Sequence, residues 1–183
     1  MTPLILTFTG KQVNPLDLLA EDLDIRDIAH ALACCNRFAG HTKRPISVAQ
    51  HSVYVSRLCK AQDAMQGLLH DASEAYLGDV TKWLKATPEF TAFREAEDRL
   101  QKLVYTRYGC RATMVSAVAD ADKLMLRFEG EVSFSGWPKW SSRWVGYPLL
   151  TLQERALIGA WKPWSWRIAQ EAFLVQFKLL GGK

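Results

Sequence analysis

A chain of 183 residues, 49% hydrophobic and 23% charged, can bury one sizeable core and has the composition of an ordinary globular domain. The formal net charge of +4 is too small and too dispersed to indicate a nucleic-acid surface, and no apolar run approaches the ~20 residues that span a bilayer. We therefore expect one domain over 1–183, with neither nucleic acid nor membrane as a partner. The N-terminal residues resemble no signal peptide, so the expected location is the cytoplasm.

The first 45 residues are predicted to hold one β element and one helix. β-forming residues within 1–13, closed by Thr9-Gly10-Lys11, allow a short strand or hairpin. Apolar side chains recur at helical spacing over 25–36 and predict an amphipathic helix there. Glycine and proline then mark a loop over 38–45.

Two helices are predicted between this loop and Gly78. Ser47 is a good N-cap for a helix that runs to about Lys60. A second helix covers about 61–75, and Gly78 marks the turn after it.

The second half of the chain is also predicted to be helical. Thr87 is a good N-cap, Pro88 suits the first helical position, and Gly109 follows the end of that helix. Three more helices and a tryptophan-rich loop are expected, the helices over 112–134, 151–160 and 164–180 and the loop over 136–148. The pattern predicts an all-α fold with a short N-terminal hairpin.

The adjacent pair His70-Asp71 is the main chemical signal, because an imidazole and a carboxylate side by side can reach one divalent ion. His51 lies on the preceding predicted helix, and Asp120 or Asp122 offers a further carboxylate. Two nitrogen and two oxygen donors suit Mn, Co, Ni, Fe or Zn better than a thiolate-selective ion. These residues are therefore candidate metal ligands.

Glu74 has the spacing of a proton-transfer group beside such an ion. If residues 61–75 form one helix, His70 and Glu74 share a face one turn apart. A divalent metal can lower the pKa of a bound water to about 7, and a nearby carboxylate can then accept its proton. Glu74 is therefore a candidate catalytic base.

Several stretches give the chain a resemblance to the HD-domain nucleotide phosphohydrolases. They are DIAHAL (27–32), NRFAGHT (36–42), SVAQHS (47–52), HDASEAYLGDV (70–80), Lys85, and ADK (121–123) followed by Glu129. The pattern is most similar to the phage dATP triphosphohydrolases, the DatZ group, and more distantly similar to the bacterial 5′-deoxynucleotidases. The resemblance implies an HD-domain helical bundle that acts in a bacterial or phage-infected cytoplasm.

The resemblance also implies roles for individual acidic and histidine residues. The positions that match its metal ligands are His51, His70, Asp71 and Asp122. Asp122 is preferred to Asp120 because it is the aspartate of the ADK stretch, and residues two apart differ by about 200° around a helix. Glu74 matches the catalytic carboxylate, and Asp79 matches a second acidic residue of the site.

Three further residues are predicted to contact the substrate. Arg37 and Lys85 occupy the family's phosphate-binding positions, and guanidinium groups bind phosphate oxygens in a bidentate fork. Lys82 lies nearer to Asp79 but matches no motif. Phe38 could stack on a base or sugar, with core packing as the alternative.

The implied activity is metal-dependent hydrolysis of deoxynucleotide phosphates, with dATP converted to deoxyadenosine and phosphates as the leading prediction. The alternatives are a 5′-deoxynucleotidase that acts on dNMPs and a nucleotide-binding HD module without catalysis. The expected cofactor is one of the divalent ions above, and Mg²⁺ could accompany the phosphates. Family members form dimers or hexamers, so a homo-oligomer is also implied.

The remaining histidines and the tryptophans have structural interpretations. His30 is expected to be a hydrogen-bonded core residue, whereas His41 could shape its loop or touch phosphate. For the tryptophans core packing is the first interpretation and oligomer contact the second. This set is Trp137, Trp140, Trp144, Trp161, Trp164 and Trp166.

Overall fold

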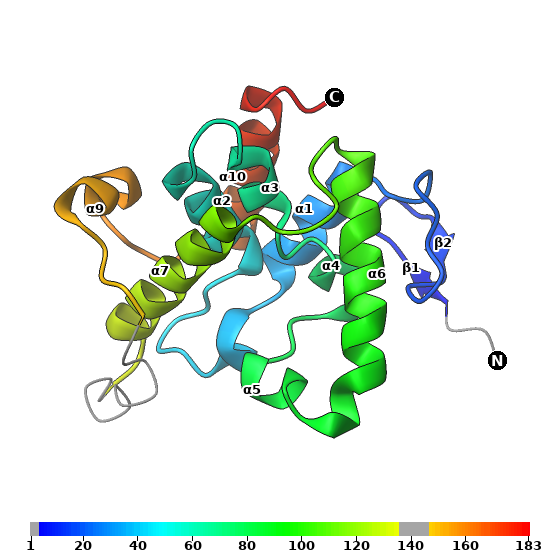
Figure 1. Cartoon of the computed structure of the whole chain (residues 1–183), viewed down its shortest axis with the longest axis horizontal. Coiled ribbons are helices and arrows are strands. Elements are labelled where there is room, and N and C mark those ends of the chain that lie inside the picture. Colours follow the sequence, from blue (N-terminus) through cyan, green and yellow to red (C-terminus); the bar gives the residue numbers. More distant parts are fainter. Residues whose placement is uncertain (1–3, 136–146) are drawn as a thin grey trace.

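The computed structural model describes residues 4–135 and 147–183. These residues form a bundle of α-helices with one two-stranded hairpin near the N-terminus (Figure 1). The predicted all-α class and the short hairpin are therefore both confirmed.

The hairpin is fastened to the first helix. Strands β1 (Ile5–Leu6) and β2 (Gln12–Val13) pair antiparallel, and the turn between them carries Thr9. The backbone N–H and the hydroxyl of Thr9 donate to the carboxylate of Asp27, at 2.6 and 2.9 Å. Asp27 lies in the first turn of α1 (Ile25–Cys34), so the hairpin covers that end of the helix.

Helix α2 (Val48–Leu58) is the centre of the bundle. Its predicted cap is confirmed, because Ser47 Oγ accepts a hydrogen bond from the backbone N–H of Gln50 at 3.2 Å. Every residue over 48–56 is buried, as expected for a helix surrounded by others. The helices packed on it are α1, α3 (Ala64–Leu69), α7 (Ser116–Ser133), α9 (Leu152–Ile158) and α10 (Trp166–Leu179) (Figure 1).

The single helix predicted over 61–75 is wrong. Helix α3 ends at Leu69, turns with i→i−3 hydrogen bonds follow, and α4 (Glu74–Leu77) begins a new helix. The break has a local cause, because the imidazole of His70 donates to the carbonyl of Gly67 at 2.9 Å. That carbonyl would otherwise accept the next backbone N–H of a continuing α-helix.

The segment from Lys82 to Ser133 differs from its prediction at the helix starts and in one short helix that was not predicted, α5. Helix α5 (Lys82–Lys85) is short, and the 3₁₀ turn η2 (Pro88–Phe90) precedes α6 (Thr91–Arg107). Thr87 stands before Pro88 as expected, but its side chain makes no capping hydrogen bond. Helix α7 begins at Ser116 rather than at residue 112.

The C-terminal helices match their predicted ranges closely. Thr151 and Glu154 form a capping box at the start of α9, and Ser165 caps α10. The loop predicted over 136–148 lies outside the described residues except for its last two positions. Among the described helices, none is both long and apolar enough to cross a membrane.

Candidate metal centre

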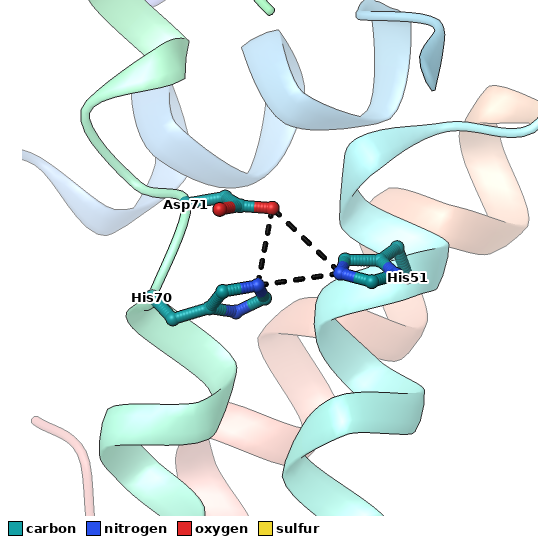
Figure 2. Close-up of side chains that lie close together, drawn as sticks. All are labelled: His51, His70 and Asp71. Carbon is teal, nitrogen blue, oxygen red and sulfur yellow. Dashed lines mark hydrogen bonds and ion pairs between the residues drawn. The ribbon is translucent and has the colours of Figure 1, made fainter. Parts of the chain in front are cut away.

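Four side chains from three helices converge at the middle of the bundle. His51 comes from α2, His70 and Asp71 follow the end of α3, and Asp122 comes from α7. Figure 2 shows His51, His70 and Asp71 turned toward one another. Asp122 Oδ1 lies 3.1 Å from His51 Nε2 and 3.8 Å from His70 Nε2. The structure therefore brings together the four residues predicted to be ligands.

The spacing of the donor atoms fits a small divalent ion. The two Nε2 atoms are 3.3 Å apart, and Asp71 Oδ2 lies 3.1 Å from that of His70 and 3.8 Å from that of His51. Donors about 2.1 Å from an ion and arranged tetrahedrally are separated by about 3.4 Å. One ion could therefore bind all of these atoms with little movement.

Hydrogen bonds on the far side of each imidazole direct its Nε2 lone pair into the centre. His70 Nδ1 donates to the carbonyl of Gly67 at 2.9 Å, and a carbonyl can only accept. His51 Nδ1 donates to Glu129 Oε1 at 3.1 Å. A second partner of this kind is the usual companion of a metal-binding histidine, because it fixes the tautomer and the ring orientation.

The two histidines meet because α3 approaches α2 closely at Gly67. A β-carbon at this position would lie 2.9 Å from Cys59 Sγ and 3.2 Å from Ser56 Cα. Contacts this short would push the helices apart. Gly67 therefore sets the helix separation that places His51 and His70 within reach of one ion.

The electrostatics of the cluster call for positive charge at its centre. Burial lowers the pKa of His70, but Asp71 and Asp122 more than offset this and raise the pKa well above its usual value. Burial raises the pKa of Asp71, yet the two imidazoles hold it at about 2. The carboxylates that retain a proton on the imidazoles would equally retain a cation, so the donor set fits a divalent metal.

The choice between Asp120 and Asp122 is clear from their positions. Asp120 is exposed and accepts a hydrogen bond from Lys123 Nζ at 3.1 Å, one turn along α7. Asp122 faces α2 and contacts His51. Asp122 is therefore the position that can supply a ligand.

A cavity of about 610 Å³ opens over the centre. Asp71 and Asp122 lie at its floor. Its walls include all five residues predicted to act on the substrate, which are Arg37, Phe38, Glu74, Asp79 and Lys85. Much of its outer part, called the rim below, comes from the turn η1 (Arg37–Gly40) and from α5.

Glu74 has one oxygen without a partner. Its side chain is 6% exposed, and Oε1 lies 3.6 Å from Lys85 Nζ. Oε2 is buried and forms no hydrogen bond to a described residue. Burial, with Asp71 and Asp79, raises the pKa of Glu74 well above its usual value. A buried polar atom of this kind calls for a water or a ligand atom, and Glu74 lines the cavity.

Arg37 lies in the cavity wall but already has two carboxylate neighbours. Its Nε donates to Glu129 Oε2 at 2.9 Å, and Nη1 lies 3.5 Å from Asp71 Oδ2. Burial lowers the pKa of Arg37, but these carboxylates more than offset it and keep the guanidinium charged. A phosphate would therefore share this side chain with Glu129 and Asp71.

Lys85 also lines the cavity and is likewise paired with carboxylates. Its Nζ donates to Glu97 Oε1 of α6 at 2.8 Å and lies near Glu74. Glu97 was not predicted to belong to the site, because nothing in the sequence pattern of α6 distinguishes it from a solvated glutamate. Asp79, which follows Gly78 (φ +82°), completes this wall, and burial raises its pKa.

The rim contains strained backbone. Phe38 and Ala39 both have left-handed conformations, with φ of 56° and 49°, which cost about 1–2 kcal/mol each for residues other than glycine. The Phe38 ring meets Phe134 edge-on at 5.2 Å and lies beside the guanidinium of Arg37. Phe38 is half-buried, packs on Phe134 and lines the cavity, and its stacking on a base or sugar stays a prediction.

Glu129 belongs to the stretches that carry the family resemblance, but no role in the site was predicted for it or for two apolar residues of the cavity wall. Glu129 is wholly buried and joins His51 to Arg37. It lies seven residues after Asp122, on the same helical face, and this spacing could have found it. Trp83 and Phe134 add apolar wall to the cavity, and their positions have no sequence signal.

The other histidines and tryptophans lie elsewhere. His30 is part-buried, and its Nδ1 lies at hydrogen-bond distance, 3.1 Å, from Gln170 Oε1, as predicted; its ring also stacks on Phe8. His41 is exposed and is not among the residues that line the cavity. Trp161 and Trp164 pack against Tyr54, which confirms core packing for these two, and Trp166 meets His30 edge-on. The other three tryptophans (137, 140 and 144) lie outside the described residues, and the expected homo-oligomer stays a prediction.

Comparison with known proteins identifies relatives but no matching family model. The chain is 36% identical over 138 residues to the uncharacterized protein YfdR of Escherichia coli, covering 73% of this chain and 76% of that protein. It is 34% identical over 136 residues to the uncharacterized protein RCAP_rcc00048 of Rhodobacter capsulatus, covering 67% and 69% respectively.

Proposed function

The chain belongs to the same protein family as YfdR and RCAP_rcc00048, and we propose that it is a metal-dependent HD-domain phosphohydrolase of deoxynucleotides. One observation carries the proposal. A two-histidine, two-carboxylate donor set reaches a cavity through Asp71 and Asp122. The same cavity is lined by two cationic side chains and by Glu74, one oxygen of which has no hydrogen-bond partner among the described residues.

The cationic walls fit a phosphate group. Lys85 and Arg37 both line the cavity, and their charges are held there by Glu97 and Glu129. Charge-assisted hydrogen bonds to phosphate oxygens are the strong kind, and guanidinium groups bind them in a fork. A phosphate between these two side chains would lie above the metal centre.

The chemistry would be divided between the metal and Glu74. A divalent ion held by His51, His70, Asp71 and Asp122 would lower the pKa of water and polarise a phosphoryl oxygen. Glu74 would accept the water's proton at Oε2, the atom that has no hydrogen-bond partner among the described residues. Asp79 would stand on the same side of the cavity and help to orient the water.

The apolar walls fit a nucleoside. Phe38, Trp83 and Phe134 line the cavity, and its volume is within the range of small-molecule sites. We propose dATP as the preferred substrate, with deoxyadenosine and phosphates as products. A 5′-deoxynucleotidase that uses the same residues on dNMPs is the second candidate, because the metal floor and cationic walls serve one phosphate as well as three.

The experiment is a panel of all dNTPs and dNMPs with Mn²⁺, Co²⁺, Mg²⁺ and Zn²⁺, with products separated by chromatography. We expect metal-dependent release of deoxyadenosine from dATP, faster than the corresponding reaction of dGTP. Equal rates on dATP and dGTP would remove the base preference, and activity confined to dNMPs would make the protein a 5′-deoxynucleotidase. Nucleotide binding without turnover under every metal would contradict the enzyme proposal.

A further inference from the structure

Glu129 joins the two functional parts of the site. It lies on α7, and its side chain has no exposed surface. Oε1 accepts from His51 Nδ1 at 3.1 Å, and Oε2 accepts from Arg37 Nε at 2.9 Å. One carboxylate therefore orients a predicted metal ligand with one oxygen and a predicted phosphate-binding side chain with the other.

The two histidines of the centre differ in how they are oriented. His70 is fixed by a backbone carbonyl, which no substitution at that position removes. His51 is fixed by the side chain of Glu129. A buried acceptor with negative charge keeps the proton on Nδ1, which leaves the Nε2 lone pair free for a metal ion.

Only a carboxylate can accept from both donors. The amide of a glutamine has one acceptor oxygen and one donor nitrogen. If its oxygen faced His51, the amide nitrogen would meet the N–H of Arg37, and two donors would be opposed. If its nitrogen faced His51, the imidazole would be driven to the Nε2–H tautomer, which cannot bind a metal through that atom.

We propose that Glu129 is a positioning residue that fixes the donor atom of His51 and the guanidinium of Arg37 together. The idea rests on the proposed function only in requiring that the centre binds a divalent ion. Two consequences follow. Glu129 would control the metal affinity of the centre without being a ligand itself, and a substitution at Arg37 would change this metal affinity through Glu129.

The test is a titration of the metal-free full-length protein with Co²⁺, without nucleotide, followed by the visible absorption of the bound ion. Outer hydrogen-bonding partners of metal ligands typically contribute 10–100-fold to metal affinity, so Glu129→Gln should weaken Co²⁺ binding by about that factor. The matched control is Glu131→Gln on the same helix, where Glu131 bonds Arg127 at 3.0 Å instead. It should bind Co²⁺ within about twofold of the wild type.

The outcomes separate this inference from the proposed function. If the wild type binds Co²⁺ and Glu129→Gln binds it equally well, the inference is wrong and the metal enzyme stands. If the wild type binds neither Co²⁺ nor Zn²⁺, both the inference and the proposed metal enzyme fail. The coupling of Arg37 to the centre is tested with Arg37→Gln, whose effect on Co²⁺ affinity should largely disappear when Glu129→Gln is also present. If the fold-losses in Co²⁺ affinity of the two single variants multiply in the double variant, Arg37 does not act through Glu129.

A measurement on the wild type covers the case in which Glu129→Gln does not fold. The ¹⁵N chemical shifts of the imidazoles in the Zn²⁺-loaded protein report which nitrogen carries the proton. We expect His51 and His70 both to carry it on Nδ1, with Nε2 bound to zinc. Protonation of His51 at Nε2, or coordination through its Nδ1, would overturn the inference.

Discussion

The metal centre and the rim of the cavity are built in opposite ways. The centre draws its side chains from α2, the end of α3 and α7, and both His51 and Glu129 are wholly buried. The rim consists of a 3₁₀ turn with two left-handed residues and of α5, a four-residue helix without a buried residue. The proposed ligands therefore come from packed helices and the turn after α3, whereas the proposed substrate contacts at the rim come from two short segments, one of which has strained backbone.

This contrast places the residues proposed for metal binding and those proposed for substrate selection in different parts of the molecule. Packed helices hold donor atoms within the few tenths of an ångström that a metal ion tolerates, because protein interiors are dense and resist deformation. Short segments at a surface change more readily in shape and sequence, and residues that select ligands are often found on them. We expect substitutions at the floor to abolish activity and substitutions at the rim to reduce it only in part.

The largest effect is expected at the floor. Asp71→Ala removes a proposed ligand and leaves Asp122 to supply the carboxylate beside the Nε2 atoms of His51 and His70, so both metal and activity should be lost. Elemental analysis of the purified variant measures the metal. The control is Asp120→Ala, an exposed aspartate near the start of α7, which should keep both. A variant of Asp71 that keeps stoichiometric metal would show that this residue is no ligand.

The next effect is expected at Glu74, between floor and rim. Glu74→Gln keeps the size of the side chain but removes its ability to take a proton. Positioned proton transfer contributes about 10²–10⁴-fold to rate, so turnover should fall by that range while metal content stays at the wild-type level. Glu89→Gln, an exposed change in η2, serves as the control. Normal turnover in Glu74→Gln would make Asp79 the next candidate.

A graded effect is expected at the rim. Lys85→Met keeps the aliphatic stem but removes the charge that faces Glu97 and the cavity. Loss of a hydrogen bond to a charged group costs about 1.5–3 kcal/mol, so kcat/KM should fall roughly 10–150-fold. The control, Lys102→Met on the exposed face of α6, should change little. An unchanged kcat/KM in Lys85→Met would remove phosphate binding from this residue.

The same contrast explains what the sequence could predict. Helices with long apolar repeats, such as α2 after its Ser47 cap and α10, were predicted closely in range. Such ranges can be predicted because side-chain directions in a regular helix repeat with a fixed period. The grouping of His51, His70, Asp71 and Asp122 was implied by the family resemblance of the stretches that contain them.

The failures lie where tertiary contacts decide the local structure. The break after Leu69 depends on a bond from the His70 side chain to a backbone carbonyl, which no propensity encodes. The partners Glu97 and Glu129 come from helices far along the chain. The left-handed conformation of Phe38 has no signal, because glycine is the residue that usually adopts it.

The smallest predicted effect tests the strain of the rim directly. Ala39 has φ 49°, a left-handed conformation that costs an alanine about 1–2 kcal/mol and a glycine almost nothing. A glycine also loses about 0.4–1 kcal/mol more conformational entropy on folding, so the two terms partly cancel. Ala39→Gly should therefore raise the free energy of unfolding by about 0.5–1 kcal/mol, measured by urea denaturation.

The same substitution at Ala119, inside α7, should lower the free energy of unfolding by about 1 kcal/mol, because a helical alanine has no strain to release. Destabilisation of similar size by both substitutions would show that the turn at Ala39 is not strained in solution, and the contrast between a relaxed floor and a strained rim would then fail at this residue.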